Sequence, residues 1–153
     1  MSGDGSSEKM RWSTERRLEF IEFRLFWDGR VNRSDLVEFF GISVPQASAD
    51  LGRYQEVADR NLVYDKRAKS YLVTQEFKPV LLELDAQRYL AQLRLIANDI
   101  LPKQESWLGW MPPYATVPSI ARRVEPLTLR KVLDVIRSGS DIHVEYQSLS
   151  RPC

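Results

Sequence analysis

The chain has 153 residues, 43% of them hydrophobic and 28% charged, which is enough for one soluble globular domain, or for one small domain and part of a second. Its 22 basic and 21 acidic residues leave a net charge of +1, so the overall charge does not indicate a nucleic-acid partner. One Cys and one His exclude a disulfide framework and argue against a metal or cofactor site, and no apolar run approaches the roughly 20 residues of a membrane span. We therefore expect a cytoplasmic protein with no membrane partner.

The first predicted helix begins at Ser13 or Thr14, after an unstructured start over residues 1–11, and ends near Trp27. Gly29 follows, where a helix end favours a residue that tolerates positive φ. Apolar residues cover more than half of the helix circumference, which predicts burial on two sides, as for the first helix of a three-helix core. Two basic residues near its start are expected on a solvated face: Arg16 and Arg17.

The next predicted helix runs from Arg33 to Phe40, with Asn32 or Ser34 as its cap, and it stops at Gly41. A third helix starts almost at once. A turn of about three residues that contains a Gly separates the two helices of a helix-turn-helix. The sequence therefore predicts this motif, whose second helix lies in the major groove of DNA.

The candidate recognition helix begins with the sequence SVPQ from Ser43 to Gln46 and runs to about Val57 or Ala58. These four residues fit a capping box, with Ser at the N-cap, Pro in the first turn and Gln three residues after the cap. Residues spaced at i, i+4, i+7 and i+11 form the predicted buried seam: Ala47, Leu51, Tyr54 and Ala58. The opposite face is predicted to carry Gln46, Ala49, Asp50 and Arg53.

The side chains of that face suit different parts of a DNA groove. The Gln46 amide can pair with N6 and N7 of adenine, or it only completes the capping box. Ser43 and Ser48 suit phosphate oxygens. Arg53 can reach a guanine edge or the backbone, or it pairs with an acidic neighbour. The Asp50 carboxylate would be repelled by DNA unless it accepts from cytosine N4 or orients Arg53.

Two β-prone runs follow, Leu62–Asp65 and residues 70–74, around the basic sequence KRAK. A hairpin with a basic tip directly after a recognition helix is typical of a wing that contacts the DNA backbone, although such a tip is often merely solvated. Each phosphate contact would steepen the dependence of log affinity on log salt concentration by about one unit. The complete predicted DNA-contact set is Arg33, Ser43, Val44, Pro45, Gln46, Ser48, Ala49, Asp50, Arg53, Lys66, Arg67 and Lys69.

A family resemblance rests on the sequence FGISVPQASADLGRYQEVADRNLVYDKRAKSYLV over residues 40–73, followed by Phe77-Lys78-Pro79. It resembles the N-terminal domain of WYL-domain transcriptional regulators, most closely the repressors of BREX- and CBASS-type anti-phage defence islands. The resemblance extends from about Trp12 to the C-terminus. It implies a homodimeric repressor that binds double-stranded DNA at an inverted-repeat operator, sometimes of its own operon. A small-molecule or nucleotide effector would require a complete WYL domain.

Residues 81–117 are predicted as a helical and Pro/Trp-rich linker. Asp85 caps a helix that reaches about Ile100. Its apolar stripe is either ordinary core or a surface for a second subunit, and we favour dimerisation because the small DNA-binding domain cannot bury it fully. The aromatic residues after it are expected in an extended segment that packs against a neighbouring domain or subunit. The predicted dimerisation residues are Tyr89, Leu90, Leu93, Ile96, Trp107 and Trp110.

Residues 118–153 resemble the start of a WYL domain, which would be truncated here. We expect a short strand over residues 120–124, then a helix from Pro126 to Arg137, then a strand over residues 141–148. Four residues of the helix are expected to face inward: Leu129, Val132, Leu133 and Ile136.

Together these features predict an α+β chain, with a winged helix-turn-helix domain over residues 12–80, the helical linker, and an incomplete α/β segment of WYL type. The predicted function is sequence-specific DNA binding by a repressor of a phage-defence operon. The alternative is a protein–protein interaction module that uses the winged helix and the apolar C-terminal half. An enzyme is not expected, because no phosphate-binding loop or nucleophile accompanies the one His.

Overall fold

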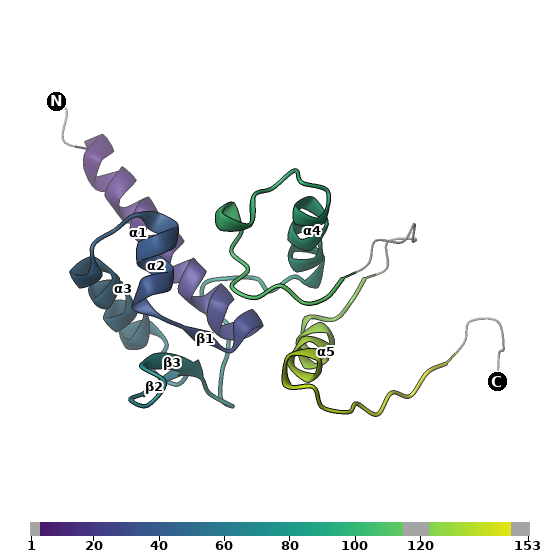
Figure 1. Cartoon of the computed structure of the whole chain (residues 1–153). Coiled ribbons are helices and arrows are strands. Elements are labelled where there is room, and N and C mark those ends of the chain that lie inside the picture. Colours follow the sequence, from purple (N-terminus) through teal and green to yellow (C-terminus); the bar gives the residue numbers. More distant parts are fainter. Residues whose placement is uncertain (1–3, 115–122, 148–153) are drawn as a thin grey trace.

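The computed structural model describes residues 4–114 and 123–147, and Figure 1 shows the arrangement of the elements. Helix α1 lies at the centre, with α2, α3 and a small sheet on one side and α4 and α5 on the other. The elements are α1 (Asp4–Asp28), β1 (Arg30–Val31), α2 (Arg33–Phe40), α3 (Val44–Val57), β2 (Leu62–Asp65), β3 (Ser70–Val73), α4 (Ala86–Ala97), the 3-10 helix η1 (Lys103–Glu105) and α5 (Pro126–Ser138). Among the described residues, no helix has both the length and the apolar character needed to cross a membrane.

Helix α1 is buried on two sides, as its sequence predicts. One stripe, which includes Ile21 and Leu25, belongs to a core cluster with residues of α2 and α3. A second stripe, which includes Phe23 and Trp27, belongs to another cluster with residues of α4 and α5. The helix starts at Asp4 rather than at Ser13, and so takes in part of the segment expected to be unstructured. Neither Gly nor Pro occurs between Ser6 and Asp28, so nothing in this sequence interrupts the helix.

The helix-turn-helix forms with the predicted boundaries. Gly41 ends α2 in the left-handed conformation, at a φ of 63°. Ser43 begins α3, and its Oγ accepts a hydrogen bond from the Gln46 N–H at 3.3 Å. In α2, the Asp35 carboxylate reaches back and accepts from the Asn32 N–H at 2.6 Å. Local capping chemistry therefore fixes where both helices begin and where α2 ends.

The predicted hairpin is present and gains a third strand. β2 pairs with β3 antiparallel, from Leu62 opposite Val73 to Asp65 opposite Ser70. The short β1 pairs with the other edge of β3, so that the strand order is β1-β3-β2. The sequence did not predict β1, because two residues are too few to show an alternating pattern. Three helices with this sheet confirm the α+β winged helix-turn-helix fold.

Glu22 joins three parts of the chain although it is fully buried in α1. Its carboxylate accepts a hydrogen bond from the Tyr54 hydroxyl of α3 at 3.0 Å. It also accepts from the backbone N–H groups of Val80, Leu81 and Leu82 at 2.7–2.9 Å. These bonds satisfy the buried charge and hold the start of the linker against α1.

Helix α4 starts after Asp85 as predicted, since the Asp85 carboxylate accepts from the Gln87 N–H at 2.8 Å. Its apolar stripe, however, packs within the chain. Tyr89 is fully buried and Leu93 is 8% exposed, both in the cluster that α1 shares with α4 and α5. This corrects the expectation that these two residues form a free surface for a second subunit. α1 supplies the partner surface, because it carries the second apolar stripe.

The linker aromatics also pack within the chain. The Trp107 ring lies edge-on against Phe20 and Phe23, with centroids at 5.8 and 5.5 Å. The Trp110 ring lies under the Arg137 guanidinium at 4.7 Å. Leu90 and Ile96, which are partly buried, pack against the same cluster as Tyr89. The segment therefore packs against the neighbouring domain, which was one of the two expectations for it.

The C-terminal segment matches its predicted helix and departs from its predicted strands. α5 begins at Pro126 and ends at Ser138, one residue beyond its expected end, and Leu133 is buried. Val132 and Ile136 are 38% and 43% exposed, so the expected inward face is only partly buried. Residues 141–147 are exposed and form no strand, and residues 120–122 lie outside the described part. A strand requires a neighbouring strand, and none is described there, so the WYL-like segment stays a prediction.

Asp28 is the point where α1, the linker and α5 meet, and its side chain is 7% exposed. Its Oδ2 accepts from the Gly109 N–H at 2.9 Å and lies 3.6 Å from Nε of Arg24. Its Oδ1 lies 3.9 Å from Nη2 of Arg137, which also donates to the Trp27 carbonyl at 3.0 Å. Burial raises the pKa of Asp28 to about 6, because desolvation outweighs the lowering effect of the two arginines and of the backbone donors.

This raised pKa predicts a pH-dependent stability. A carboxyl whose folded pKa of about 6 exceeds its ordinary value of 3.8 contributes most below pH 4, and loses that contribution as the pH rises through 6. Compared with an Asp28→Asn variant, the wild-type chain should lose up to about 3 kcal/mol of unfolding free energy between pH 4 and pH 7. Urea denaturation at several pH values measures it. A difference between the two chains that does not change with pH would contradict the burial argument.

Candidate nucleic-acid interface

The exposed side of α3 and the tip of the β2–β3 hairpin form the candidate DNA-binding surface. Both lie on the side of α1 that faces away from α4 and α5 (Figure 1). The predicted seam of α3 is buried, and the other side of the helix is exposed from its first turn to its last. The exposed members of the predicted contact set are Arg33, Ser43, Val44, Pro45, Gln46, Ala49, Arg53, Lys66, Arg67 and Lys69, and Ser48 is partly exposed.

Asp50 does not belong to this surface. It is 1% exposed, and its carboxylate points to α1, where Arg17 binds both oxygens. The Arg17 Nε lies 2.6 Å from Oδ2, and its Nη2 lies 3.3 Å from Oδ1. Two expectations are thereby corrected: Asp50 is not a DNA contact, and Arg17, at 8% exposure, is not solvated. The pair lies where α1 crosses α3, and each charge can be buried there because the other neutralises it.

Gln46 is exposed, and its side chain takes part in this network. Its Nε2 donates to Oδ1 of Asp50 at 3.1 Å, one helical turn further along α3. The first half of the predicted capping box, the bond from the Gln46 N–H to Ser43, is present. The side-chain amide of Gln46, which would form the second half, bonds instead to the Asp50 carboxylate. Asp50 faces Arg17, so it does not orient Arg53, which was one of the roles considered for it.

The conformation of the wing tip depends on Asp65, the last residue of β2. Its Oδ1 accepts from the backbone N–H groups of Arg67 at 2.7 Å and of Ala68 at 3.1 Å. Lys69 closes the turn in the left-handed conformation, at a φ of 49°. An Asp that bonds to the backbone two or three residues later is a common turn signal and could have been read from the sequence. The turn leaves the cations of the tip exposed: Lys66, Arg67 and Lys69.

The local charge of this surface differs from the net charge of the chain. Because Arg17 neutralises Asp50, the N-terminal half of α3 exposes no carboxylate. The cation of the helix is Arg53, in its C-terminal half. The exposed acid of the helix is Glu56, near its C-terminal end. Ala49 and Gly52, which precede Arg53, have small side chains or none and leave the helix narrow there. The surface can therefore approach a polyanion closely with its N-terminal half.

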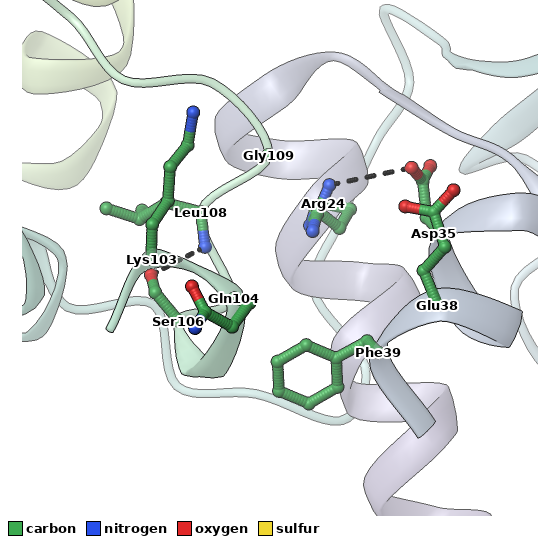
Figure 2. A pocket seen from close by; sticks show the side chains of 9 residues that line it. All are labelled: Arg24, Asp35, Glu38, Phe39, Lys103, Gln104, Ser106, Leu108 and Gly109. Carbon is green, nitrogen blue, oxygen red and sulfur yellow. Dashed lines mark hydrogen bonds and ion pairs between the residues drawn. The ribbon is translucent and has the colours of Figure 1, made fainter. Parts of the chain in front are cut away.

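A concave region, shown in Figure 2, lies where the linker crosses α1 and α2. Its volume is about 340 Å³. Arg24 is its central charge, and this guanidinium is already engaged. It lies 3.8 Å from Asp35, 3.6 Å from Asp28 and 4.7 Å from the centroid of the Phe20 ring. Gly109 lines the same region, and a Cβ there would lie 2.1 Å from Nη1 of Arg24, so that a side chain at this position would displace the guanidinium. The region thus serves the docking of the linker.

The two helices joined at Gly41, the three-stranded sheet and the basic hairpin define a winged helix-turn-helix protein. Residues 13–95 match the family of the BrxR transcriptional regulator winged helix-turn-helix domain, and the chain belongs to this family. The match confirms the resemblance that the motifs of residues 40–73 indicate. The family is one of transcriptional regulators and not of enzymes.

Similar proteins carry the name DNA-binding transcriptional repressor CapW. The one from Stenotrophomonas maltophilia is 48% identical over 152 residues, which cover 99% of this chain and 50% of that protein. The one from Pseudomonas aeruginosa is 47% identical over 142 residues, which cover 93% of this chain and 48% of that protein. A relative from Escherichia coli is 46% identical over the same length. The chain spans about half the length of the curated relatives it matches.

The buried ion pair predicts a large effect of a single substitution. Arg17→Met leaves the Asp50 carboxylate buried without its counter-charge, and should lower the free energy of unfolding by about 3–5 kcal/mol. Adding Asp50→Leu removes the remaining charge and should recover most of that loss. Arg11→Met, at an exposed position of α1, is the control and should stay within about 0.5 kcal/mol of wild type. If urea denaturation shows Arg17→Met to be as stable as the control, the pair has no such role.

Proposed function

We propose that this chain is the DNA-binding part of a transcriptional repressor, in which α3 lies in the major groove and the β2–β3 tip contacts the backbone. The observation that carries this proposal is the exposed face of α3, free of carboxylates in its N-terminal half, beside a tip with three exposed cations. The names of the similar CapW proteins support it. The resemblance to defence-island regulators supports an operator near a phage-defence operon.

In this arrangement the parts of the surface have different tasks. The first turns of α3 would meet the base edges, because recognition helices contact bases with their N-terminal residues. Ala49 and Gly52 would let the helix enter the groove deeply. Lys66, Arg67 and Lys69 would bind phosphates, which gives affinity and fixes the register without reading the sequence. Occupation of a promoter by such a complex would exclude other proteins and so repress transcription.

We also propose that two chains bind one operator as a symmetric pair, one α3 in each half of an inverted repeat. A single α3 reads only a few base pairs, and a second copy one helical turn away extends the site. Tyr89 and Leu93 are buried by α1 and are poor candidates for the contact. Two exposed apolar residues are better placed for it: Leu95, near the end of α4, and Ile100, shortly after that helix.

The stoichiometry of the complex tests the paired arrangement. Once footprinting has located the operator, light scattering should find two chains on the full inverted repeat and one chain on a duplex that carries a half-site. A single chain on the full repeat, at concentrations that saturate it, would rule out the paired arrangement and leave DNA binding itself intact.

The wing predicts a specific salt dependence. Fluorescence anisotropy with a duplex from the upstream region of its own operon should show an affinity that falls steeply with salt concentration. Replacement of Lys66, Arg67 and Lys69 by Ala should weaken binding to all duplexes evenly. It should also lower the salt slope, which is the slope of log affinity against log salt concentration, by about one unit for each phosphate that the variant no longer binds.

A matched control removes the same charge elsewhere. Arg88, Arg94 and Lys131 are exposed residues of α4 and α5, on the other side of α1. Their replacement by Ala changes the net charge equally and should leave the slope near that of wild type. Equal slopes for all three proteins would show that the wing touches no phosphate. No competable binding by the wild-type chain at low salt would refute the proposed function, and the interaction-module hypothesis would then be preferred.

A further inference from the structure

The network around Asp50 links a buried charge to an exposed side chain of α3. The Asp50 side chain is 2% exposed, and its carboxylate is held by the Arg17 guanidinium, which donates from Nε and from Nη2. Arg17 in turn donates from Nη2 to the Thr14 hydroxyl at 3.2 Å within α1. The remaining bond to the carboxylate comes from Gln46, whose Nε2 lies 3.1 Å from Oδ1. The position of the carboxylate is therefore set by the core, not by solvent.

This geometry dictates which end of the Gln46 amide faces the protein. A carboxylate paired with an arginine can only accept hydrogen bonds. The NH₂ end of the amide therefore points to Asp50, and a rotation by 180° would place the amide oxygen against the carboxylate oxygen. An exposed glutamine elsewhere is free to present either end. At Gln46, one N–H is used by Asp50, and the other N–H and Oε1 remain for a ligand.

We propose that Arg17 and Asp50 are positioning residues that make Gln46 discriminate between adenine and guanine in the major groove. This inference rests on the proposed function. Adenine presents an N7 acceptor and an N6 donor, which match the remaining N–H and Oε1 of Gln46. Guanine presents N7 and O6, both acceptors, so its O6 would meet Oε1 without a proton between them. Asp50 prevents the amide from turning over. Gln46 therefore cannot present its whole NH₂ group to the N7 and O6 acceptors of guanine.

Gln46 could instead serve only the protein, by satisfying the buried carboxylate. The two roles differ in what a substitution does. If the bond to Asp50 only stabilises α3, loss of the amide lowers the affinity for all sequences by the same factor. If the bond orients a reader, loss of the amide removes the preference at one base pair, and loss of the orienting charges relaxes the same preference while the glutamine is still present.

The test is a binding selection from a randomised duplex library, followed by affinity measurements on the adenine and guanine versions of the selected site. The wild-type chain should prefer adenine over guanine at one position of each half-site by about tenfold or more. Gln46→Ala should lose the preference at that position alone. The variant Arg17→Gln/Asp50→Asn keeps hydrogen-bonding groups of similar shape but lets the amide face either way. It should reduce the preference by about fivefold or more at the same position, with Gln46 intact.

Matched variants and a check of folding complete the experiment. Gln55→Ala removes the same side chain from another exposed position of α3 and should leave the preference unchanged. If Arg17→Gln/Asp50→Asn does not fold, as judged by circular dichroism, Arg17→Met/Asp50→Leu removes the orienting charges with an apolar pair. A folded double variant that keeps the full wild-type preference overturns the proposal, as does a Gln46→Ala variant that weakens all sequences equally. In both cases the wild-type chain still selects a site, so the proposed function stands. A wild-type chain that selects no sequence overturns both.

Discussion

The structure depends on α1 being apolar on two sides. A helix of this kind cannot lie on the surface of a small domain, so one side must be covered by the helix-turn-helix and the other by the segments that follow the wing. The two core clusters correspond to these two sides, and α1 contributes to both. The position of the linker is therefore not independent of the DNA-binding domain. Any rearrangement of α4 would expose Phe23 and Trp27 to water.

Buried charges give this apolar contact a defined geometry. Arg17, Glu22 and Asp28 follow one another along α1 and bind different elements: α3, the segment at residues 80–82 together with Tyr54, and the linker with α5. Apolar burial has no preferred direction, whereas a carboxylate that accepts from several donors within 3.0 Å fixes the positions of those donors. Such groups contribute little net stability, because desolvation offsets the attraction. Their effect is to fix where α3 and the linker lie relative to α1.

Local signals in the sequence were sufficient for most of the fold. Asn32, Gly41, Ser43 and Asp85 mark helix ends by short-range chemistry, and those boundaries agree with the structure. The burial of Asp50 was not predictable in this way, because its partner is 33 residues earlier and a carboxylate without a known partner is expected on the polar side. Helical spacing puts Asp50 at the edge of the buried seam, where either orientation is open. The packing partner of Tyr89 was likewise not predictable, since an apolar stripe on a helix does not identify the surface that buries it.

The correction at Asp50 also explains how a chain with a net charge of only +1 can present a surface suited to DNA. At physiological salt, charges more than about 8 Å from a phosphate are largely screened, so the distant acids of the linker and α5 matter little. The nearest acid on α3 is paired inside the protein, and the nearby exposed cations are those of the tip and Arg53. A modest number of cations gives a modest non-specific affinity. Recognition would then depend more on base contacts, and hence on how firmly the protein holds the side chain that makes them.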